Sequence, residues 1–383
     1  MKKIFKKLIV IILCISLLGG IAIYAYGRNS AADTSPAPNG FADFAEKFSS
    51  VFAGSANEKA DVKFTITQGE IFEAKKYFSD SHASTIAKMP DGNLISAFFA
   101  GPQEGNADVR IWYSIHDGEG WSEPKQLASP DPVAHWNPVL INYGDYMRLY
   151  YKVGMEIPNW VTKYCDSFDC GKTWTEPQEL VPGDTSGGRG PVKNKLIVTS
   201  KGTIIAPASS EQGSWRAFFD ISEDGGKTWT KTDFVIAKDS KGNEVGMIQP
   251  TLWEDKEGNI HAMFRTKAGR IYRTDSTDGG YTWCEAYSTD LMNNNSGIDC
   301  VMTDNGWLWL AYTPVGMEVR NRLILSVSKD NGKTWQDVTV LEESANLFAE
   351  YSYPAIIAEG NNLYITYTYN RVTIKYAFIE FEG

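Results

Sequence analysis

The chain has 383 residues, a formal net charge of -10 at pH 7 and an apolar fraction of 43%, which is enough for a large core. Such an acidic chain, with no cluster of Lys and Arg interleaved with aromatic residues, argues against a nucleic-acid binding protein. Aromatic residues make up 13% of the sequence, and because they favour strands over helices we expect an all-β protein.

The first 27 residues predict export. Lys2, Lys3, Lys6 and Lys7 precede an almost wholly apolar run over 8–27, which is the order of charged and apolar segments in secretory signals. The run is also about long enough to span a bilayer. Residues 1–27 are therefore a cleaved signal peptide or an uncleaved signal anchor. Either interpretation predicts an extracytoplasmic protein, secreted or anchored to the cell membrane through this segment alone.

Residues 28–60 have the composition of a linker, with many Ala, Ser, Pro and Asn residues. Within them Phe41, Phe44, Phe48, Val51 and Phe52 recur at helical spacing, which predicts one short amphipathic helix. We expect this helix to pack on the following domain or to space it from the membrane, in preference to binding a partner.

An internal repeat dominates the chain from residue 61 onward. The pattern Ser-x-Asp-x-Gly-x-x-Trp, called the Asp box below, occurs four times cleanly and once in degenerate form, starting at Ser114, Ser167, Ser222, Ser276 and Ser328. These serines are 53, 55, 54 and 52 residues apart, the size of one four-stranded blade with its loops. The Asp and Gly of each box suit a tight turn between two strands, so their expected role is structural.

Six apolar segments predict the innermost strand of each blade. They begin near residues 81, 135, 191, 248, 297 and 351, and each is followed by a turn and a second strand. Dividing residues 61–383 by six gives about 54 residues a blade, in agreement with the box spacing. The sequence thus predicts one all-β domain over 61–383, a six-bladed β-propeller of four-stranded antiparallel blades with Asp-box turns.

Polar residues gather at the starts of these inner strands, which converge at one mouth of the channel in a propeller. They are His82, His135, Asn137, Lys193, Asn194, Gln249, Asp299, Tyr351 and Tyr353. Arg189 and Arg371 are expected at the same mouth. Convergent polar groups in a largely apolar chain predict a ligand pocket. Positive groups there, in a protein of net charge -10, predict an anionic ligand such as a sialic acid or a uronic acid.

His82 and His135 are two of only four His and are predicted at equivalent points of adjacent blades. Because His shuttles protons near neutral pH, we expect one of them to bind substrate or to act as an acid or base. The structural alternative is a hydrogen bond from each ring to a neighbouring strand.

The Asp boxes, the six blades and the exported context resemble the sialidase (neuraminidase) superfamily, in particular its bacterial proteins with BNR repeats, over about residues 70–383. The resemblance implies an exo-acting glycoside hydrolase. Three Arg would bind the substrate carboxylate, an Asp would be the acid/base, and a Tyr would be the nucleophile with a Glu as its base. A guanidinium matches a carboxylate with two parallel hydrogen bonds, and a phenol needs a base to attack at neutral pH.

Residue by residue, the resemblance makes Tyr351, in the stretch Glu350-Tyr351-Ser352, the nucleophile. Asp108 is the acid/base in the loop after the second strand of the first blade, where Glu104 also stands. The predicted substrate-binding set is Arg189, Lys193, Gln249, Arg265, Arg320, Arg371 and Asn137.

Two positions depart from the family pattern. His82 stands where the first Arg is expected, and Gln249 stands where the Glu is expected, 16 residues before the matching Arg265. An amide cannot take a proton from a Tyr. Two further hypotheses therefore stay open, namely a polysaccharide lyase that uses His or Tyr on uronic-acid glycans, and a non-catalytic glycan-binding propeller.

No cofactor is expected, because the four His do not cluster at zinc-ligand spacing; a structural calcium ion is left open. The pairs Cys165–Cys170 and Cys284–Cys300 are candidate local disulfides, with free buried thiols as the alternative. The expected partner is a glycan or glycoconjugate, and the expected state is a monomer.

Overall fold

The computed structural model describes residues 39–53 and 55–383. The predicted signal or anchor over 1–27 lies outside the described residues. Within them, no helix combines the length and the apolar character needed to cross a membrane. The chain divides into two units, residues 1–48 and 49–383.

The one α-helix of the described chain, α2 (Asn39–Ala53), lies in the segment for which a short helix is predicted. Its last turn belongs to the larger unit, where Ser50 Oγ accepts a hydrogen bond from the backbone N–H of Gly316 at 2.9 Å. Nearby, Val51 is buried, whereas the side chain of Phe52 is 62% exposed.

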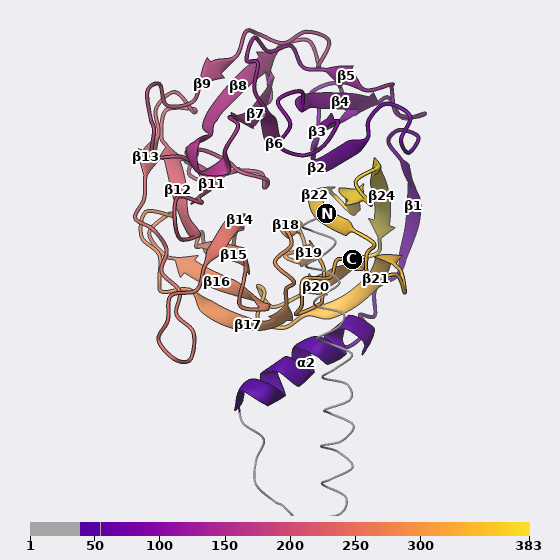
Figure 1. Ribbon diagram of the computed structural model, residues 1–383, viewed down its shortest axis with the longest axis vertical. Helices are drawn as coiled ribbons and strands as arrows, with labels where there is room; N and C mark the ends of the chain where they lie inside the picture. The colour runs from indigo at the N-terminus through magenta and orange to yellow at the C-terminus, as the bar shows by residue number, and fades with distance from the viewer. Residues whose placement is uncertain (1–38, 54) are drawn as a thin grey trace, which may run out of the picture. The chain divides into compact units, whose positions relative to one another are not determined.

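The larger unit is a ring of six four-stranded antiparallel sheets, with β2, β6, β10, β14, β18 and β22 nearest the axis (Figure 1). The first blade has β2 (Asp80–Lys88), β3 (Leu94–Gly101), β4 (Arg110–His116) and β5 (Lys125–Gln126), and the second has β6 (His135–Asn142), β7 (Met147–Val153), β8 (Val161–Ser167) and β9 (Gln178–Glu179). The third has β10 (Ile197–Val198), β11 (Ile204–Ser210), β12 (Arg216–Ser222) and β13 (Thr230–Lys231), and the fourth has β14 (Met247–Glu254), β15 (Ile260–Thr266), β16 (Arg270–Ser276) and β17 (Tyr287–Met292). The fifth has β18 (Asp299–Met302), β19 (Leu308–Tyr312), β20 (Arg322–Ser328) and β21 (Gln336–Glu343), and the sixth has β22 (Tyr351–Glu359), β23 (Asn362–Tyr369), β24 (Thr373–Phe381) and β1 (Phe64–Glu70). A short 3-10 helix, η1 (Ile157–Asn159), precedes β8.

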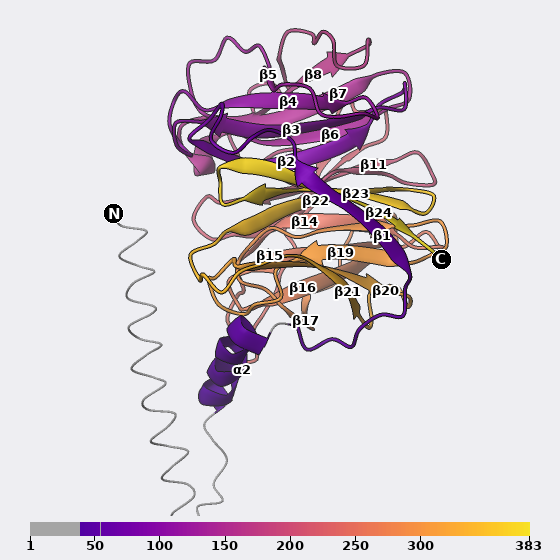
Figure 2. The same ribbon diagram turned by 90° about the vertical axis from the view of Figure 1, so that its right-hand side faces the viewer.

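The two ends of the domain close the ring together. β1 pairs antiparallel with β24 from Phe64 opposite Phe381 to Glu70 opposite Lys375, so the first strand of the chain is the outer strand of the last blade (Figure 2). This pairing covers the backbone groups that an edge strand would leave open. The sequence pattern did not predict it.

The predicted all-β, six-bladed propeller is confirmed. Five of the six predicted inner strands are regular, and the third is largely irregular, because β10 contains only Ile197 and Val198 of the segment that begins at residue 191. Lys193, in this segment, has a left-handed backbone with φ of 68°. Apolar side chains fill the spaces between neighbouring blades, such as Phe99 of β3 against Trp136 of β6.

The Asp boxes form turns between the third and fourth strands, as predicted. In the box of the second blade, Asp169 Oδ1 accepts the backbone N–H of Thr173 at 2.8 Å, and Ser167 Oγ accepts that of Gly171 at 2.8 Å. The same contacts recur around Asp224, Asp278 and Asp330. The four cysteines of the described chain, Cys165, Cys170, Cys284 and Cys300, are free, so neither candidate disulfide forms.

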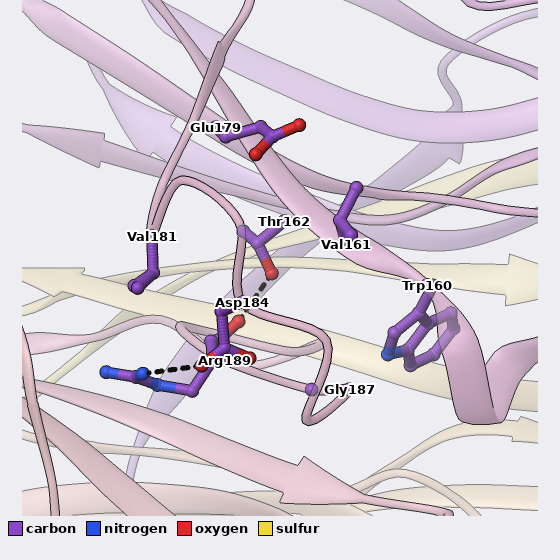
Figure 3. A pocket seen from close by; sticks show the side chains of 9 residues that line it. Trp160, Val161, Thr162, Glu179, Val181, Asp184, Gly187 and Arg189 are labelled. Carbon is purple, nitrogen blue, oxygen red and sulfur yellow. Dashed lines mark hydrogen bonds and ion pairs between the residues drawn. The ribbon is translucent and has the colours of Figure 1, made fainter.

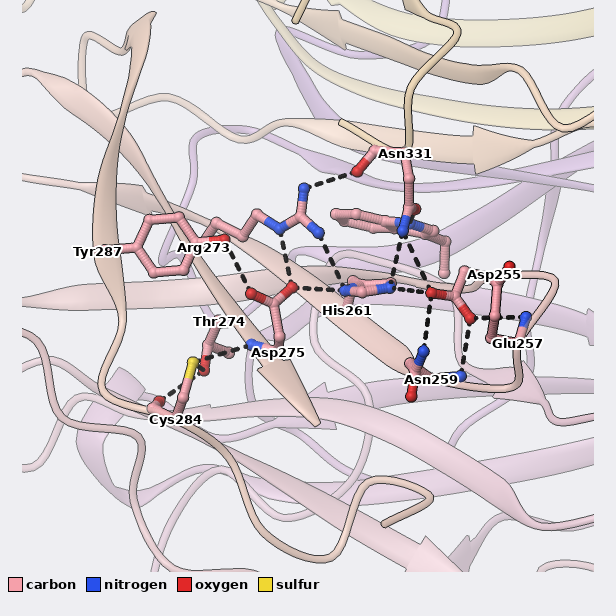
Figure 4. Close-up of polar contacts among 11 residues, drawn as sticks. Asp255, Glu257, Asn259, His261, Arg273, Thr274, Asp275, Cys284, Tyr287 and Asn331 are labelled. Carbon is pink, nitrogen blue, oxygen red and sulfur yellow. Dashed lines mark hydrogen bonds and ion pairs between the residues drawn. The ribbon is translucent and has the colours of Figure 1, made fainter. Parts of the chain in front are cut away.

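A buried polar network joins the fourth blade to the Asp box of the fifth (Figure 4). The His261 ring lies between two carboxylates, with Nδ1 2.5 Å from Asp275 and Nε2 2.8 Å from Asp255. Arg273 donates to both Asp275 and the backbone carbonyl of Asn331. The polar groups of this network use their hydrogen-bonding capacity on one another, so His261 has a structural role.

Candidate functional site

The axial ends of the inner strands share an unusual backbone conformation. Ala83, Asn137, Lys193, Gln249 and Tyr353 stand at equivalent positions of five blades and have φ between 44° and 68°. At four of these positions the register between the first and second strands of the blade shifts, which marks a β-bulge in the inner strand. A left-handed backbone costs roughly 1–2 kcal/mol for a residue with a side chain. Such strain gathers at functional sites, so the axial mouth is where a site is expected.

The fifth blade has Gly297 at the equivalent position of its sequence. A Cβ atom there would lie 2.9 Å from Cε of Lys193 and 3.5 Å from Cδ2 of Tyr353. Because contacts below 3.0 Å are not tolerated without a shift of the neighbour, a side chain at this position would displace the residues of the mouth.

Arg265, on β15, is the centre of a polar cluster at this mouth. Its Nη1 donates to Tyr353 Oη at 2.6 Å and to Gln249 Oε1 at 2.9 Å. Its Nε and Nη2 donate to Oδ1 of Asn295 at 3.3 and 3.1 Å. Arg265 is only 5% exposed, yet the three atoms that accept these four hydrogen bonds are all uncharged. Within the described chain Arg265 forms no ion pair.

The second and third arginines of the cluster share one carboxylate. Glu350 accepts Nη1 of Arg320 at 2.7 Å and Nε of Arg371 at 3.1 Å. Burial alone would raise the pKa of Glu350, but the two guanidiniums outweigh burial and hold that pKa well below its usual range. Glu350 is therefore a fixed anion that positions Arg320 and Arg371.

Arg371 is neutralised more fully than the other two arginines. Besides Glu350, it binds Glu104 at 2.7 Å and lies 3.6 Å from Asp80. Its Nη2 is 3.5 Å from Nε2 of His82. Among the described residues, three carboxylates thus surround Arg371, one binds Arg320 and none binds Arg265, so the positive charge of the cluster is concentrated on the side of Arg265.

His82 and Tyr353 lie side by side on neighbouring inner strands. Their ring centroids are 4.2 Å apart. His82 is buried, whereas Tyr353 is partly exposed, and the guanidiniums of Arg265 and Arg320 lie 5.6 and 5.8 Å from the Tyr353 ring. A phenol, an imidazole and two guanidiniums from four blades therefore lie close together.

Two partly exposed residues of the third blade, Trp215 and Glu211, lie near Arg265. Trp215 lies under two cations, with the Arg265 guanidinium 5.2 Å and the Lys267 ammonium 3.8 Å from its ring. Burial raises the pKa of the nearby Glu211, although Arg265 and Lys267 act in the opposite direction. A carboxyl group with a raised pKa next to a cluster of cations is suited to proton transfer.

Tyr351, the predicted nucleophile, does not reach this cluster. It is 4% exposed and stacks on Tyr369, with ring centroids 5.2 Å apart, in the core between the fifth and sixth blades. The bulge that follows Ser352 turns the side chain of Tyr353, and not that of Tyr351, toward the axis. The role that the resemblance implies for a Tyr is therefore matched better by Tyr353.

His135 also lies away from His82. Its Nδ1 and Nε2 are 2.8 Å from the Val133 carbonyl and the Ser129 hydroxyl, and its ring stacks on Tyr151. The strand registers align His82 with Trp136 and not with His135. Because side chains alternate between the two faces of a strand, an offset of one residue points His135 away from the mouth.

Arg189 is bound elsewhere, beside a small pocket at the edge of the second blade (Figure 3). It forms ion pairs with Asp220 at 2.8 Å and Asp184 at 3.1 Å. Lys193 does point to the axis, but its buried ammonium donates to Asn194 Oδ1 and to the backbone carbonyls of Ile298 and Pro354. Burial lowers the pKa of Lys193 to about 7. Both side chains therefore serve the scaffold.

Two predicted residues have no partner within the described chain for their side-chain polar atoms. Asp108 is exposed in the loop between β3 and β4, where Glu104, and not Asp108, reaches the cluster. The buried Asn137 is held at the mouth by its left-handed backbone. The structure thus brings together His82, Gln249, Arg265, Arg320 and Arg371, and it adds Tyr353, Glu350, Asn295 and Glu211 to them.

One signal in the sequence could have identified Tyr353. The dipeptides Asn137-Pro138, Gln249-Pro250 and Tyr353-Pro354 occupy the same place in the repeat, and alignment of the blades on Pro puts Tyr353 at the axial bulge. No comparable signal exists for Asn295 or Glu211, because both lie in loops outside the repeated strands.

The ring of six blades and the arginine–tyrosine cluster define a propeller of the sialidase superfamily. The family described as "BNR repeat-like domain" matches residues 92–365. The match covers more than half of the chain, and the chain belongs to this family. None of the curated proteins matches the sequence.

Several solved structures share the fold. A protein of unknown function from Dyadobacter fermentans is 15% identical with a TM-score of 0.68, over 83% of this chain and 99% of that chain. The Hadza microbial sialidase Hz136 is 16% identical with a TM-score of 0.67, over 81% and 68%. Trypanosoma rangeli sialidase in complex with the inhibitor DANA is 17% identical with a TM-score of 0.64, over 83% and 60%. At these identities the likeness establishes the fold.

Proposed function

We propose that this protein is a sialidase-like exo-glycoside hydrolase that removes a terminal acidic sugar, a sialic acid or a related acid, from glycans. The observation that carries the proposal is the buried Arg265, a cation whose hydrogen-bond partners within the described residues are all neutral and include the hydroxyl of Tyr353. A buried charge without a counter-ion is costly, and the carboxylate of a bound sugar would supply the counter-ion.

In this proposal Arg265 and Arg320 bind the sugar carboxylate, and Asn137 binds a neutral polar group of the ring. Tyr353 is the nucleophile. Its Oη forms a bond to the anomeric carbon while the bond from that carbon to the leaving oxygen breaks. Arg265 already donates a hydrogen bond to Tyr353 Oη at 2.6 Å. It would stabilise the negative charge that the phenol gains as it loses its proton.

The proton transfers need one acid and one base. We assign the acid to Glu211, which lies near Arg265 and Lys267 and whose pKa is raised by burial. Asp108, in the loop between β3 and β4, is the alternative. The acid protonates the leaving oxygen. Glu104 is less suited, because it is bound to Arg371. We assign the base to His82, whose ring lies against Tyr353, since Gln249 cannot accept a proton. Water then attacks the anomeric carbon while the bond from that carbon to Tyr353 Oη breaks. The deprotonated acid takes a proton from the water, and His82 returns its proton to the phenolate.

A polysaccharide lyase is the second candidate. It is favoured by one observation: within the described chain, no carboxylate is hydrogen-bonded to the Tyr353 hydroxyl, while His82 lies beside it. In such an enzyme Tyr353 or His82 would remove the proton next to a uronate carboxylate that Arg265 neutralises.

The sequence pattern alone supports our further proposal that the activity is extracytoplasmic, in a secreted protein or one anchored by its N-terminal segment.

The test is turnover by the purified full-length protein and by two variants, Tyr353→Phe and Tyr351→Phe, each of which loses only a hydroxyl. An α-linked sialoside and a panel of uronic-acid oligosaccharides are offered, and sugar release and ultraviolet absorbance are followed. We expect sugar release that Tyr353→Phe abolishes and Tyr351→Phe retains.

Other results have distinct meanings. An unsaturated, ultraviolet-absorbing product from a uronide would establish the lyase. Binding of an acidic sugar without turnover would identify a glycan-binding propeller. If the Tyr353→Phe variant turns over substrate as fast as the wild type, Tyr353 is not the nucleophile.

A further inference from the structure

Asn295 lies at the junction between the fourth and fifth blades and contacts two of the three arginines. Its side-chain Oδ1 accepts Nε and Nη2 of Arg265, and its backbone carbonyl accepts Nη2 of Arg320 at 3.4 Å. Its φ is 61°, a conformation that Asn tolerates better than most residues. We infer that Asn295 is a positioning residue that orients Arg265 and Arg320 together and leaves the charge of Arg265 available for an anionic ligand.

The side chains of the two residues before Asn295 bind the loop to the backbones of the fourth and fifth blades. Asn293 Oδ1 accepts the backbone N–H groups of Asn295 at 3.1 Å and of Thr266 at 3.2 Å, so it ties the loop to the residue after Arg265. Asn294 donates to the backbone carbonyl of Val319, the residue before Arg320. The three consecutive Asn thus connect the backbones that carry the two arginines.

The chemistry of the amide explains why this position differs from Glu350. A carboxylate orients a guanidinium and also neutralises it, as Glu350 does for Arg320 and Arg371. The Asn295 amide oxygen likewise accepts two N–H groups, both from Arg265, without adding a charge. Arg265 is therefore oriented but retains its positive charge, and the identity of residue 295 as an amide determines whether the site can bind an acid.

Glu211 does not perform this neutralising role. Glu211 and Arg265 interact electrostatically, but Arg265 forms neither a hydrogen bond nor an ion pair with Glu211 in the described chain. The inference rests on the proposed function for the nature of the ligand, an acidic sugar, but not for the state of Arg265.

The test exchanges the amide for a carboxylate of the same shape in the full-length protein. Asn295→Asp keeps both acceptor contacts, suits the left-handed backbone, and loses no hydrogen bond that the amide nitrogen makes in the described chain. Asn305→Asp is the matched control, because Asn305 is exposed in a turn and uses only Oδ1, as an acceptor. Both variants add one negative charge.

Two readouts are measured, the thermal midpoint of unfolding without ligand, and the Kd for N-acetylneuraminate, glucuronate and galacturonate. We expect Asn295→Asp to unfold at a higher temperature than Asn305→Asp, because Arg265 gains a counter-ion. We also expect its Kd to rise at least about tenfold for any probe that the wild type binds, with no change in Asn305→Asp.

A midpoint for Asn295→Asp equal to or below that of Asn305→Asp would overturn the inference, as would an unchanged Kd. If the wild type binds no acidic sugar while Asn295→Asp is still stabilised, the proposed ligand is wrong but the role of Asn295 in keeping Arg265 unneutralised stands.

Discussion

Tyr353 Oη and Arg265 Nη1 lie 2.6 Å apart, although the two residues belong to different blades and are separated by 88 positions in the chain. The contact joins a candidate nucleophile to a cation that has no carboxylate partner in the described chain. It also connects the inner strand of the sixth blade to β15 of the fourth blade, so the geometry of the site depends on the closure of the whole ring.

The first prediction concerns this cation. Arg265→Lys keeps the charge but cannot bind Tyr353, Gln249 and Asn295 at once, because an ammonium lacks the planar fork of donors. We expect kcat/KM for an acidic glycoside to fall about 100-fold. Arg216→Lys, which alters an exposed pair with Glu244, is the control and should leave turnover unchanged. Equal kinetics for the two variants would contradict the role of Arg265.

The second prediction identifies the acid. Glu211→Gln should lower kcat about 10²–10⁴-fold and remove the alkaline limb of the pH–rate profile. The loss should be much smaller for a substrate whose leaving group departs without protonation. The same profile change in Asp108→Asn, with a normal profile in Glu211→Gln, would assign the acid to Asp108.

The third prediction concerns stability at mildly acidic pH. Burial lowers the pKa of His135 to about 4 from an ordinary 6.5. Between these values the unfolded chain binds more protons than the folded one, so stability rises with pH across this window and falls as the solution is acidified. His135→Gln should flatten the slope of unfolding free energy against pH, which for one such group is at most about 1.4 kcal/mol per unit. Parallel slopes from urea titrations of both proteins would refute this.

The fourth prediction concerns the His261 network (Figure 4). Burial alone would raise the pKa of Asp275, but its bonds to His261, Tyr287 and Arg273 lower that pKa to about 2. A carboxylate with a lowered pKa stabilises the fold above its unfolded pKa, and this contribution is lost as the pH falls toward 2. His261→Phe removes one hydrogen-bond partner from each of the two carboxylates, which keep their contacts with Arg273, Tyr287 and Asn259, and we expect a loss of about 1–3 kcal/mol at neutral pH. An unchanged urea midpoint would show that the network does not stabilise the junction.

Much of the fold could be read from local sequence, because a propeller repeats one short unit. The Asp boxes and the apolar segments recur at a constant step, and each predicted turn is made by contacts among residues at most four positions apart, such as Thr173 with Asp169. The closure by β1 and β24 was missed, since Phe64 and Phe381 carry no signal of a contact across the entire domain.

The sequence by itself determined the blade count, the arrangement of strands and the set of polar residues near the axis, because period and local turn chemistry are properties of neighbouring residues. Only the tertiary structure decided which of these side chains meet. The axial bulges reverse the alternation of side chains, so Tyr353 faces the site where Tyr351 was predicted, and the offset of one residue between His82 and His135 separates a pair that looked equivalent. Whether a cation is neutralised depends on partners from other blades, as in Arg371 with Glu104 and Arg265 with Asn295. Such contacts join residues far apart in the chain, and no local pattern encodes them.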